Sequence, residues 1–359
     1  MRDVKTSYDT LILGASYGSL FAVKLVMAGH NAMMVCLPKE AETINEKGAR
    51  VRLPVKGRPA PVEIDSRTLP GKLTAAGPND VDPAKFDLVV LAMQEPQYGS
   101  PSVRELLKAV AVSHVPCMSI MNMPPLPYLK RIPGLATDAL GSSYTDASVW
   151  SSFNPRSMTL CSPDPQAYRP SGEDVNVLQV SLPTNFKAAR FASVSATAML
   201  RQMAHDIDAI RYDVGNGKIE LPVKLRVHES VFVPLAKWAM LITGNYRCVL
   251  KDEARSIKEA VHSDLAQSRA IYGWVSDLCI KLGAAPADLV PFEKYATAAE
   301  SLVRPSSVAR ALFAGAPNVE RVDRLVQAIA MQQGMRSTTL DTTVAFVDAR
   351  LAVNRRSVA

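Results

Sequence analysis

The sequence lacks several features that would assign a protein to a class at once. Its 359 residues contain no long uncharged apolar run, and their mean hydropathy of +0.04 predicts no membrane-spanning helix. The first eight residues are polar and charged, unlike a signal peptide. Hydrophobic residues nevertheless make up 48% of the chain, which is enough to form a core. We therefore expect a cytoplasmic, globular protein that does not bind membranes.

Cysteine and histidine are scarce and scattered. The five cysteines form no CxxC pair, and the five histidines show no metal-ligand spacing, so we expect reduced thiols and no metal site. The net charge of +7 is spread along the chain without a dense basic run, which predicts no nucleic-acid partner. An excess of basic residues suits a small anionic substrate or an anionic cofactor, and solubility alone is the alternative.

The N-terminal part alternates apolar strands with amphipathic helices. A strand, a glycine turn, a helix and a second strand follow one another directly, and similar units come later. This alternation predicts an α/β fold with a Rossmann-like, doubly wound parallel sheet. The expected strands are 10–13, 31–37, 86–93 and 115–121, and the expected helices are 20–27 and 103–112.

The pattern changes twice further along the chain. Residues 135–183 are rich in Ser, Pro and short β-like runs, which predicts a meander completing the first domain. Helical periodicity then dominates, at 192–210, 231–243, 256–282, 291–303 and 319–335. We therefore expect a Rossmann-like dinucleotide-binding domain over residues 1–190. A mostly α-helical domain for substrate binding and dimerisation is expected over residues 191–359, with a frayed tail from Asn354.

The turn after the first strand reads Gly14-Ala15-Ser16-Tyr17-Gly18-Ser19. In an α/β domain such a turn lets the backbone approach a pyrophosphate, and the following helix supplies free N–H groups. The G-x-G-x-x-G fingerprint is incomplete, because Ser16 replaces the middle glycine and Gly18 comes one residue early. We expect all six residues to bind a dinucleotide. The alternative is a structural turn without a ligand.

The tip of the second strand bears on the choice between NAD and NADP. An acid there would bind the ribose 2′-OH, but residues 36–38 carry no acid and Lys39 follows them. Lys39, alone or with Lys47 or Arg50, is suited to a 2′-phosphate, so NADPH is the expected cofactor. A solvated loop charge is the alternative for Lys39.

Several short segments form an ordered set along both halves of the chain. They are Gly18 to Ala22, Ala41 to Gly48, Leu91 to Gln94 with Gln97, Ser119 to Met123, Lys237 to Met240 with Gly244 and Asn245, and Arg304 to Ser307 with Gly315 and Pro317. Together they resemble the ketopantoate reductase family. The resemblance implies NADPH-dependent reduction of a 2-oxo acid to a 2-hydroxy acid. It also implies that Gln94 faces the cofactor and that Asn122 lies near the nicotinamide and the substrate.

The resemblance implies that Lys237 is the catalytic acid. Hydride transfer to a carbonyl carbon needs a proton or a strong hydrogen bond for the oxygen, and an ammonium group can supply it. A lone lysine in an apolar helix either extends to solvent or points into a cleft. Asn245 lies eight residues on and about on the same face, so we expect it to bind the substrate. A helix C-cap is its alternative role.

The late segment supplies candidates for binding a substrate carboxylate. We expect Ser306 and Ser307 to bind it through their hydroxyls and the N–H groups of the helix that follows. Capping of that helix is the alternative. Arg247 or Arg310 could clamp the carboxylate in a bidentate pair, or could serve packing and surface charge.

Glu320 is expected to be the acidic partner of Lys237 or of a substrate hydroxyl. A gapless alignment of the late segment instead places Val319 at the family's glutamate, so Glu320 would lie about 100° away around a helix. The alternative for Glu320 is an exposed acid in the first turn of a helix.

The chain also departs from the family in the polarity of its site. Leu241, Gln94 and Leu37 stand where the family has an asparagine, a lysine and a basic residue. A less polar site predicts a 2-oxo acid with a larger apolar part than ketopantoate.

Other functions fit the same residues. They are an opine-type or other hydroxy-acid dehydrogenase of this architecture, and a nucleotide-binding protein without catalytic activity. The apolar residues of the segment 271–282 lead us to expect a homodimer.

Overall fold

The computed structural model describes residues 7–215 and 217–357, which form two compact units. The first unit consists of the chain up to Met93, Ser100–Met121 and Val149–Glu229. The second consists of Gln94–Gly99, Asn122–Ser148 and the chain from Ser230 onward. The units therefore divide after Glu229 and not at residue 190, because helix α5 (Val194–Ala209) packs against helix α1 (Ser16–Met27) of the first unit. No helix of the described residues is long and apolar enough to cross a membrane.

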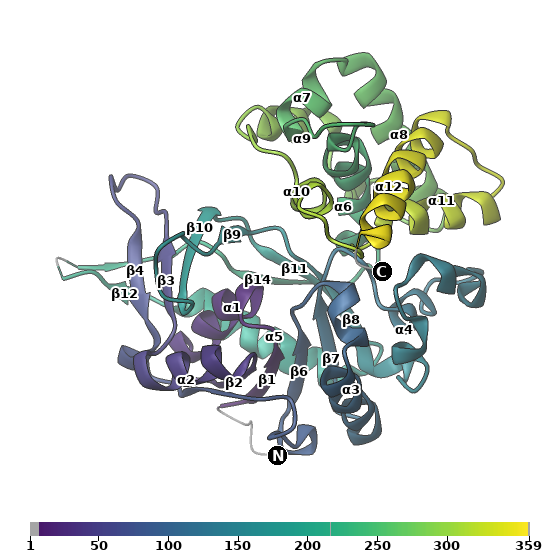
Figure 1. Ribbon diagram of the computed structural model, residues 1–359. Coiled ribbons are helices and arrows are strands. Elements are labelled where there is room, and N and C mark those ends of the chain that lie inside the picture. The colour runs from purple at the N-terminus through teal and green to yellow at the C-terminus, as the bar shows by residue number, and fades with distance from the viewer. Residues whose placement is uncertain (1–6, 216, 358–359) are drawn as a thin grey trace. The chain divides into compact units, whose positions relative to one another are not determined.

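The first unit is built on an eight-stranded sheet in the order β14-β11-β8-β7-β6-β1-β2-β5. Every neighbouring pair is parallel except β11 and β8, so the predicted doubly wound sheet is confirmed (Figure 1). Its strands are β1 (Asp9–Leu13), β2 (Asn31–Val35), β5 (Leu73–Ala76), β6 (Leu88–Leu91), β7 (Cys117–Ile120), β8 (Met158–Ser162), β11 (Phe186–Ala189) and β14 (Leu225–His228).

The register of the central strands brings the expected cofactor loops to one edge. Leu13 pairs with Val35 of β2 on one side and with Leu91 of β6 on the other. The three strands therefore end level, because parallel strands in register finish at the same edge of the sheet. Gly14 and Ala92 follow directly at this carboxyl edge, where ligands bind in open α/β sheets.

Helix α1 is buried from Gly18 to Met27, including Lys24. Its surroundings explain this, because it contacts the main sheet and also a second, four-stranded sheet of order β4-β3-β10-β9. The second sheet consists of β3 (Arg50–Leu53), β4 (Val62–Asp65), β9 (Gln166–Tyr168) and β10 (Val177–Leu182). The sequence predicted a single meander over 135–183. This was wrong, because β8 extends the main sheet beside β7 whereas β9 and β10 join the second sheet.

Two further helices of the first unit follow strands of the main sheet along the chain. Helix α2 (Pro38–Lys47) begins directly after the tip of β2, and helix α3 (Pro101–Ser113) lies between β6 and β7 along the chain. A two-stranded ribbon, β12 (Tyr212–Asp213) with β13 (Lys218–Ile219), belongs to the same unit.

The second unit is helical, as predicted. Its helices are α4 (Leu126–Leu129), α6 (Lys237–Met240), α7 (Ile257–His262), α8 (Leu265–Lys281), α9 (Phe292–Ala299), α10 (Ser307–Phe313), α11 (Val322–Gln332) and α12 (Thr338–Arg356). The predicted helix 256–282 is divided into α7 and α8, because Asp264 caps a new helix by accepting the Gln267 N–H at 2.8 Å.

Helix α12 was not predicted, and it corrects the expectation of a frayed tail from Asn354. The helix packs beside α10 and α11 (Figure 1). Asn354 is only 4% exposed, and its amide donates to the carbonyls of Leu312 and Ala316 at 2.8 and 2.9 Å. The final residues 358 and 359 lie outside the described residues.

Candidate functional site

The glycine turn of the first unit is held tightly at the carboxyl edge of the sheet. Gly14 has a φ of +107°, and a Cβ there would lie 2.6 Å from the Met93 Cγ and 2.7 Å from the Ala92 oxygen. A Cβ on Gly18 would lie 2.7 Å from the Cγ2 of Ile12. Gly14 therefore permits the turn and Gly18 permits α1 to pack on β1, which are two of the functions that glycines have in a dinucleotide fingerprint.

The N-terminus of α1 has the donors that a phosphate needs. Ala15 occupies the N-cap position without a side-chain hydrogen bond, and the first turn contains no acid. Ser16 is exposed and Tyr17 is partly exposed. Ser19 is buried and its hydroxyl donates to the Ala15 carbonyl, so this side chain is already engaged. The uncapped N–H groups and the exposed Ser16 hydroxyl fit an anionic dinucleotide.

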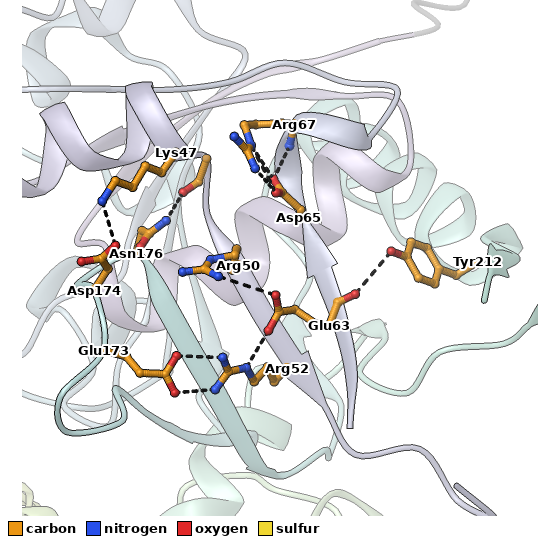
Figure 2. Close-up of polar contacts among 11 residues, drawn as sticks. Lys47, Arg50, Arg52, Glu63, Asp65, Arg67, Glu173, Asp174, Asn176 and Tyr212 are labelled. Carbon is orange, nitrogen blue, oxygen red and sulfur yellow. Dashed lines mark hydrogen bonds and ion pairs between the residues drawn. The ribbon is translucent and has the colours of Figure 1, made fainter. Parts of the chain in front are cut away.

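The basic candidates near the tip of β2 differ in their surroundings. Lys39 is exposed in the first turn of α2. Lys47 instead pairs with Asp174 at 2.9 Å, and Arg50 pairs with Glu63 at 3.8 Å (Figure 2). Of the three, Lys39 remains the best candidate for a 2′-phosphate, because Lys47 and Arg50 already have acidic partners.

Glu40 is the acid nearest in sequence to Lys39, and its carboxylate is occupied. One oxygen accepts the Leu37 N–H at 3.3 Å, and the other pairs with Arg169. Both oxygens therefore already have donors. The charge of this carboxylate is offset by the Arg169 guanidinium.

Four residues of the second unit meet in a polar cluster around the carboxylate of Glu320. The backbone N–H of Glu95 donates to Glu320 Oε1 at 3.2 Å, and the Asn122 side chain donates to the same carboxylate. The ammonium of Lys237 is close enough to stabilise the charge of Glu320. These contacts bring together three residues that the sequence proposed and one that it missed, Glu95.

The carboxyl groups of the cluster bind protons more tightly than usual. Burial, together with the charge of Glu95, raises the pKa of Glu320 from 4.5 to about 7. The hydrogen bonds from Glu95 and Asn122 and the charge of Lys237 act in the opposite direction. Burial also raises the pKa of Glu95, whose oxygens accept the N–H and the hydroxyl of Thr145 at 3.0 and 2.9 Å. Glu320 can therefore exchange a proton near neutral pH.

Asn122 keeps one polar atom without a partner. Its Oδ1 is buried and accepts no hydrogen bond from the described residues. An unsatisfied buried acceptor costs on the order of 1–3 kcal/mol. A bound hydroxyl or amide N–H would remove this cost, so the cluster is suited to a ligand with such a donor.

The main chain at Glu320 is fixed by neighbouring side chains. Tyr246 donates its hydroxyl to the Glu320 carbonyl at 2.5 Å and accepts the Val322 N–H at 3.0 Å. The buried Arg321 forms ion pairs with Asp323 and Asp348. Helix α11 begins only at Val322, so Glu320 precedes the helix.

Glu320 lies before α11, which corrects the expectation that Glu320 and Val319 are separated by about 100° around a helix. Val319 is 4% exposed and packs in the core, whereas Glu320 enters the cluster. The angle of about 100° per residue does not apply to Val319 and Glu320, because neither lies in a helix. Irregular backbone can direct either residue inward.

The segment with Lys237 and Asn245 is not one regular helix. Helix α6 ends at Met240 and continues as a π-helical turn over Leu241–Asn245. A π turn closes its hydrogen bonds one residue later than an α turn and rotates the chain less per residue. Eight residues in a pure α-helix would rotate by about 80° beyond two full turns. The π turn therefore brings Asn245 back toward the face of Lys237.

The two serine candidates have different surroundings. The buried Ser306 donates its hydroxyl to the Asn245 carbonyl at 2.6 Å and accepts the Ala309 N–H at 3.2 Å. Ser306 thus caps α10 and holds the main chain at Asn245, so its hydroxyl has a structural role. Ser307 is exposed at the start of α10.

The remaining candidates lie outside the cluster. The side chain of Gln94 is exposed, and the backbone N–H of this residue donates to the Gln97 side chain at 3.0 Å. Arg310 is exposed on α10. Arg247 is buried against α8, where it donates to Ser268 and Gln267 at 2.8 and 2.6 Å. No group of three or more His, Cys, Asp or Glu side chains in the described part of the chain is arranged to hold a metal ion.

Comparison with known proteins yields matches among solved structures alone. No protein-family model matches the sequence, and no curated protein matches it. The 2-dehydropantoate 2-reductase of Methylococcus capsulatus is 13% identical with a TM-score of 0.63, and the match covers 96% of this chain and 97% of that one. A D-mandelate dehydrogenase, in a ternary structure with NADH and anilino(oxo)acetate, is 12% identical with a TM-score of 0.63, over 97% and 99% of the chains.

A dimeric ketopantoate reductase from Staphylococcus aureus is also similar, at 11% identity and a TM-score of 0.60, over 96% of this chain and 99% of that one. These matches span nearly the full length of each protein. The chain therefore has the fold of the ketopantoate reductases, which confirms the fold implied by the resemblance.

Proposed function

We propose that this protein is an NADPH-dependent oxidoreductase that reduces the carbonyl group of a 2-oxo acid to a 2-hydroxy acid. The polar cluster of Lys237, Glu320 and Asn122 is the observation that supports this proposal most strongly, because it combines an ammonium, a carboxyl titrating near neutrality and an unsatisfied acceptor. The glycine turn with its uncapped helix supports dinucleotide binding.

The cluster provides the proton chemistry that carbonyl reduction requires. A nicotinamide cofactor, when bound, would supply the hydride for the carbonyl carbon. Lys237 donates a proton to the carbonyl oxygen as the C–O double bond becomes single, so the product is the neutral hydroxyl. Glu320 then donates a proton to the neutral amine of Lys237 and becomes a carboxylate, which its pKa of about 7 permits. Asn122 Oδ1 accepts a hydrogen bond from the amide of the cofactor or the hydroxyl of the product.

We further propose a substrate with a larger apolar part than ketopantoate. Leu241 is 3% exposed in the π turn, at the position of a polar residue in the related family. A hydrophobic residue there removes a partner for a substrate hydroxyl, which lowers affinity for polar substrates. Aromatic and branched 2-oxo acids are therefore the substrate class that we would examine first.

The first test measures nucleotide binding and turnover with the purified protein. We expect NADPH to bind more tightly than NADH, with quenching of Trp fluorescence. NADPH oxidation at 340 nm should then depend on a 2-oxo acid and be faster with phenylglyoxylate than with ketopantoate. The variant Gly14→Val should lose nucleotide binding, because the added side chain collides with Met93 and the Ala92 carbonyl.

Each alternative function predicts a different result in this assay. Turnover that requires an added amino acid would indicate an opine-type dehydrogenase. Tight NADPH binding without oxidation by any 2-oxo acid would indicate a nucleotide-binding protein. If neither nucleotide binds, the reductase proposal is rejected.

The pH dependence of reduction should report on Glu320. Its protonated form supplies the proton, so kcat for reduction should fall as the pH rises through about 7. Glu95→Gln removes a negative charge that raises the pKa of Glu320, and the inflection should move to lower pH. Glu320→Gln should abolish the inflection. A pH profile unchanged in both variants would exclude Glu320 from the proton pathway.

We also propose a homodimer, although not through the surface expected from the sequence. Ile271, Val275 and Leu278 of α8 are buried within the second unit itself. The proposal now rests on the dimeric ketopantoate reductase of similar structure.

A further inference from the structure

A cavity of about 270 Å³ lies within the helical second unit and shares no lining residue with the polar cluster around Glu320. Its walls come from the segment after the π turn, from α8 and from the beginning of α12. The lining includes two arginines, Arg247 and Arg255, four threonines and no acidic residue. A concave site with this lining has a positive charge that nothing in its walls neutralises.

Arg247 is buried, and its guanidinium hydrogen-bonds only to neutral groups among the described residues. It is 6% exposed, and its guanidinium donates to three neutral oxygens: the Thr243 carbonyl, the Ser268 hydroxyl and the Gln267 amide. It forms no ion pair within the described residues. Burying a cation in this way is costly unless an anion lies beside it. Burial and the charge of Arg255 lower the pKa of Arg247, and the charge of Asp264 acts in the opposite direction.

Arg255 brings a second positive charge to the same cavity. It is partly buried, and it donates to the Arg247 carbonyl at 3.0 Å and to the Ser263 hydroxyl at 3.3 Å. The charges of Asp264 and Glu259 act on these arginines, but Asp264 caps α8, Glu259 accepts the N–H and hydroxyl of Ser256, and neither lines the cavity. Two neighbouring guanidinium groups therefore line the cavity without an ion pair among the described residues.

Hydroxyl groups complete the opposite wall. Thr338, Thr339 and Thr342 line the cavity from the first turns of α12, and their hydroxyls make no hydrogen bond among residues 7–215 and 217–357. Hydroxyl donors together with arginines form the set that recognises the oxygens of a carboxylate or a phosphate.

We propose that this cavity is a binding site for a small organic anion that carries a carboxylate or phosphate group. Arg247 and Arg255 would neutralise the anion, and the α12 threonines would bind its remaining oxygens. The volume of about 270 Å³ admits a ligand of a few heavy atoms. The site is independent of the catalytic proposal, because it shares no residue with it.

The test is a titration of the full-length protein with inorganic phosphate and, separately, with malonate, at constant ionic strength and without nucleotide. Calorimetry and thermal unfolding should show saturable binding of at least one anion. Arg255→Gln should weaken this binding about tenfold or more, since a charge-assisted pair is lost. Lys294→Gln, which removes an exposed positive charge from α9, is the matched control and should bind like the original protein.

A second variant tests the proposal in case Arg255→Gln does not fold. Thr339→Val combined with Thr342→Val removes two hydroxyls and leaves both arginines in place, so it should weaken binding severalfold while the circular dichroism is unchanged. The relative affinities for phosphate and malonate identify the preferred head group. The proposal is overturned if neither anion binds saturably. It is also overturned if binding survives Arg255→Gln but is lost in Lys237→Met, because the anion then occupies the catalytic cluster.

Discussion

Replacing Lys237 with methionine should lower kcat for 2-oxo acid reduction by about 10²–10⁴-fold, the usual contribution of a positioned general acid. The ammonium is the group that we assign to protonate the carbonyl oxygen, and methionine keeps the length and apolar contacts of the lysine stem without the charge. Dinucleotide affinity should stay within about twofold, because the glycine turn belongs to the other unit.

Lys258→Met on α7 is the matched control, since Lys258 is exposed in the same unit. It should retain full activity. Steady-state kinetics with saturating NADPH will separate the two variants. A Lys237→Met protein that folds, binds NADPH and turns over within about threefold of the original rate would rule out Lys237 as the acid.

Replacing Lys24 with methionine should raise the free energy of unfolding by about 2–4 kcal/mol at pH 6. Lys24 is 2% exposed in the core of the first unit, and burial lowers its pKa from 10.5 to about 7, assisted by the charge of Lys224. Below pH 7 the lysine is charged in both the folded and the unfolded chain, so the folded state bears the full cost of the buried charge. Methionine fills a similar volume without that cost.

The sign of the pH dependence follows from the lowered pKa. Between about pH 7 and 10.5 the folded protein releases the Lys24 proton while the unfolded chain still holds it. The unfolded state then binds more protons, so the contribution of Lys24 to stability rises with pH. The gain from Lys24→Met should therefore be smaller at pH 9 than at pH 6 by about 2–3 kcal/mol.

Urea denaturation at both pH values measures this difference. Lys85→Met, at an exposed position of the same unit, is the control and should change stability by less than about 0.5 kcal/mol. A gain for Lys24→Met that is equal at pH 6 and pH 9 would contradict the buried charge as its cause.

Sequence patterns were most informative where local periodicity decides the structure. The apolar run at 10–13 forms all of β1 except Asp9, and the run at 86–93 contains β6, because buried parallel strands are continuous apolar segments. Helix α1 is buried from Gly18 to Met27, because two sheets contact it. That second sheet could not be predicted, because its strands come from distant parts of the chain.

The candidate site was only partly predictable, because its residues also come from distant parts of the chain. Lys237, Asn122 and Glu320 meet as the resemblance implied, but Glu95 was missed. The sequence did contain a signal for Glu95: it is an acid that follows shortly after the buried strand β6, at the edge of the sheet where ligands bind. Ser306 had two possible roles in the sequence, and only its contact with the Asn245 carbonyl distinguishes them. The turn from α to π helix at Leu241 has no recognised sequence signature.

The division of the chain into units has a practical consequence for anyone who wishes to produce one half of this protein. The chain passes from one unit to the other after Met93, Gly99, Met121, Ser148 and Glu229. Glu95, Asn122 and Glu320 lie in three separate segments of the second unit, so a gene fragment that starts at Ser230 would encode Lys237 and Glu320 but not their partners. No single cut in the coding sequence therefore yields the complete second unit, which would have to be produced by joining segments that are distant in the gene.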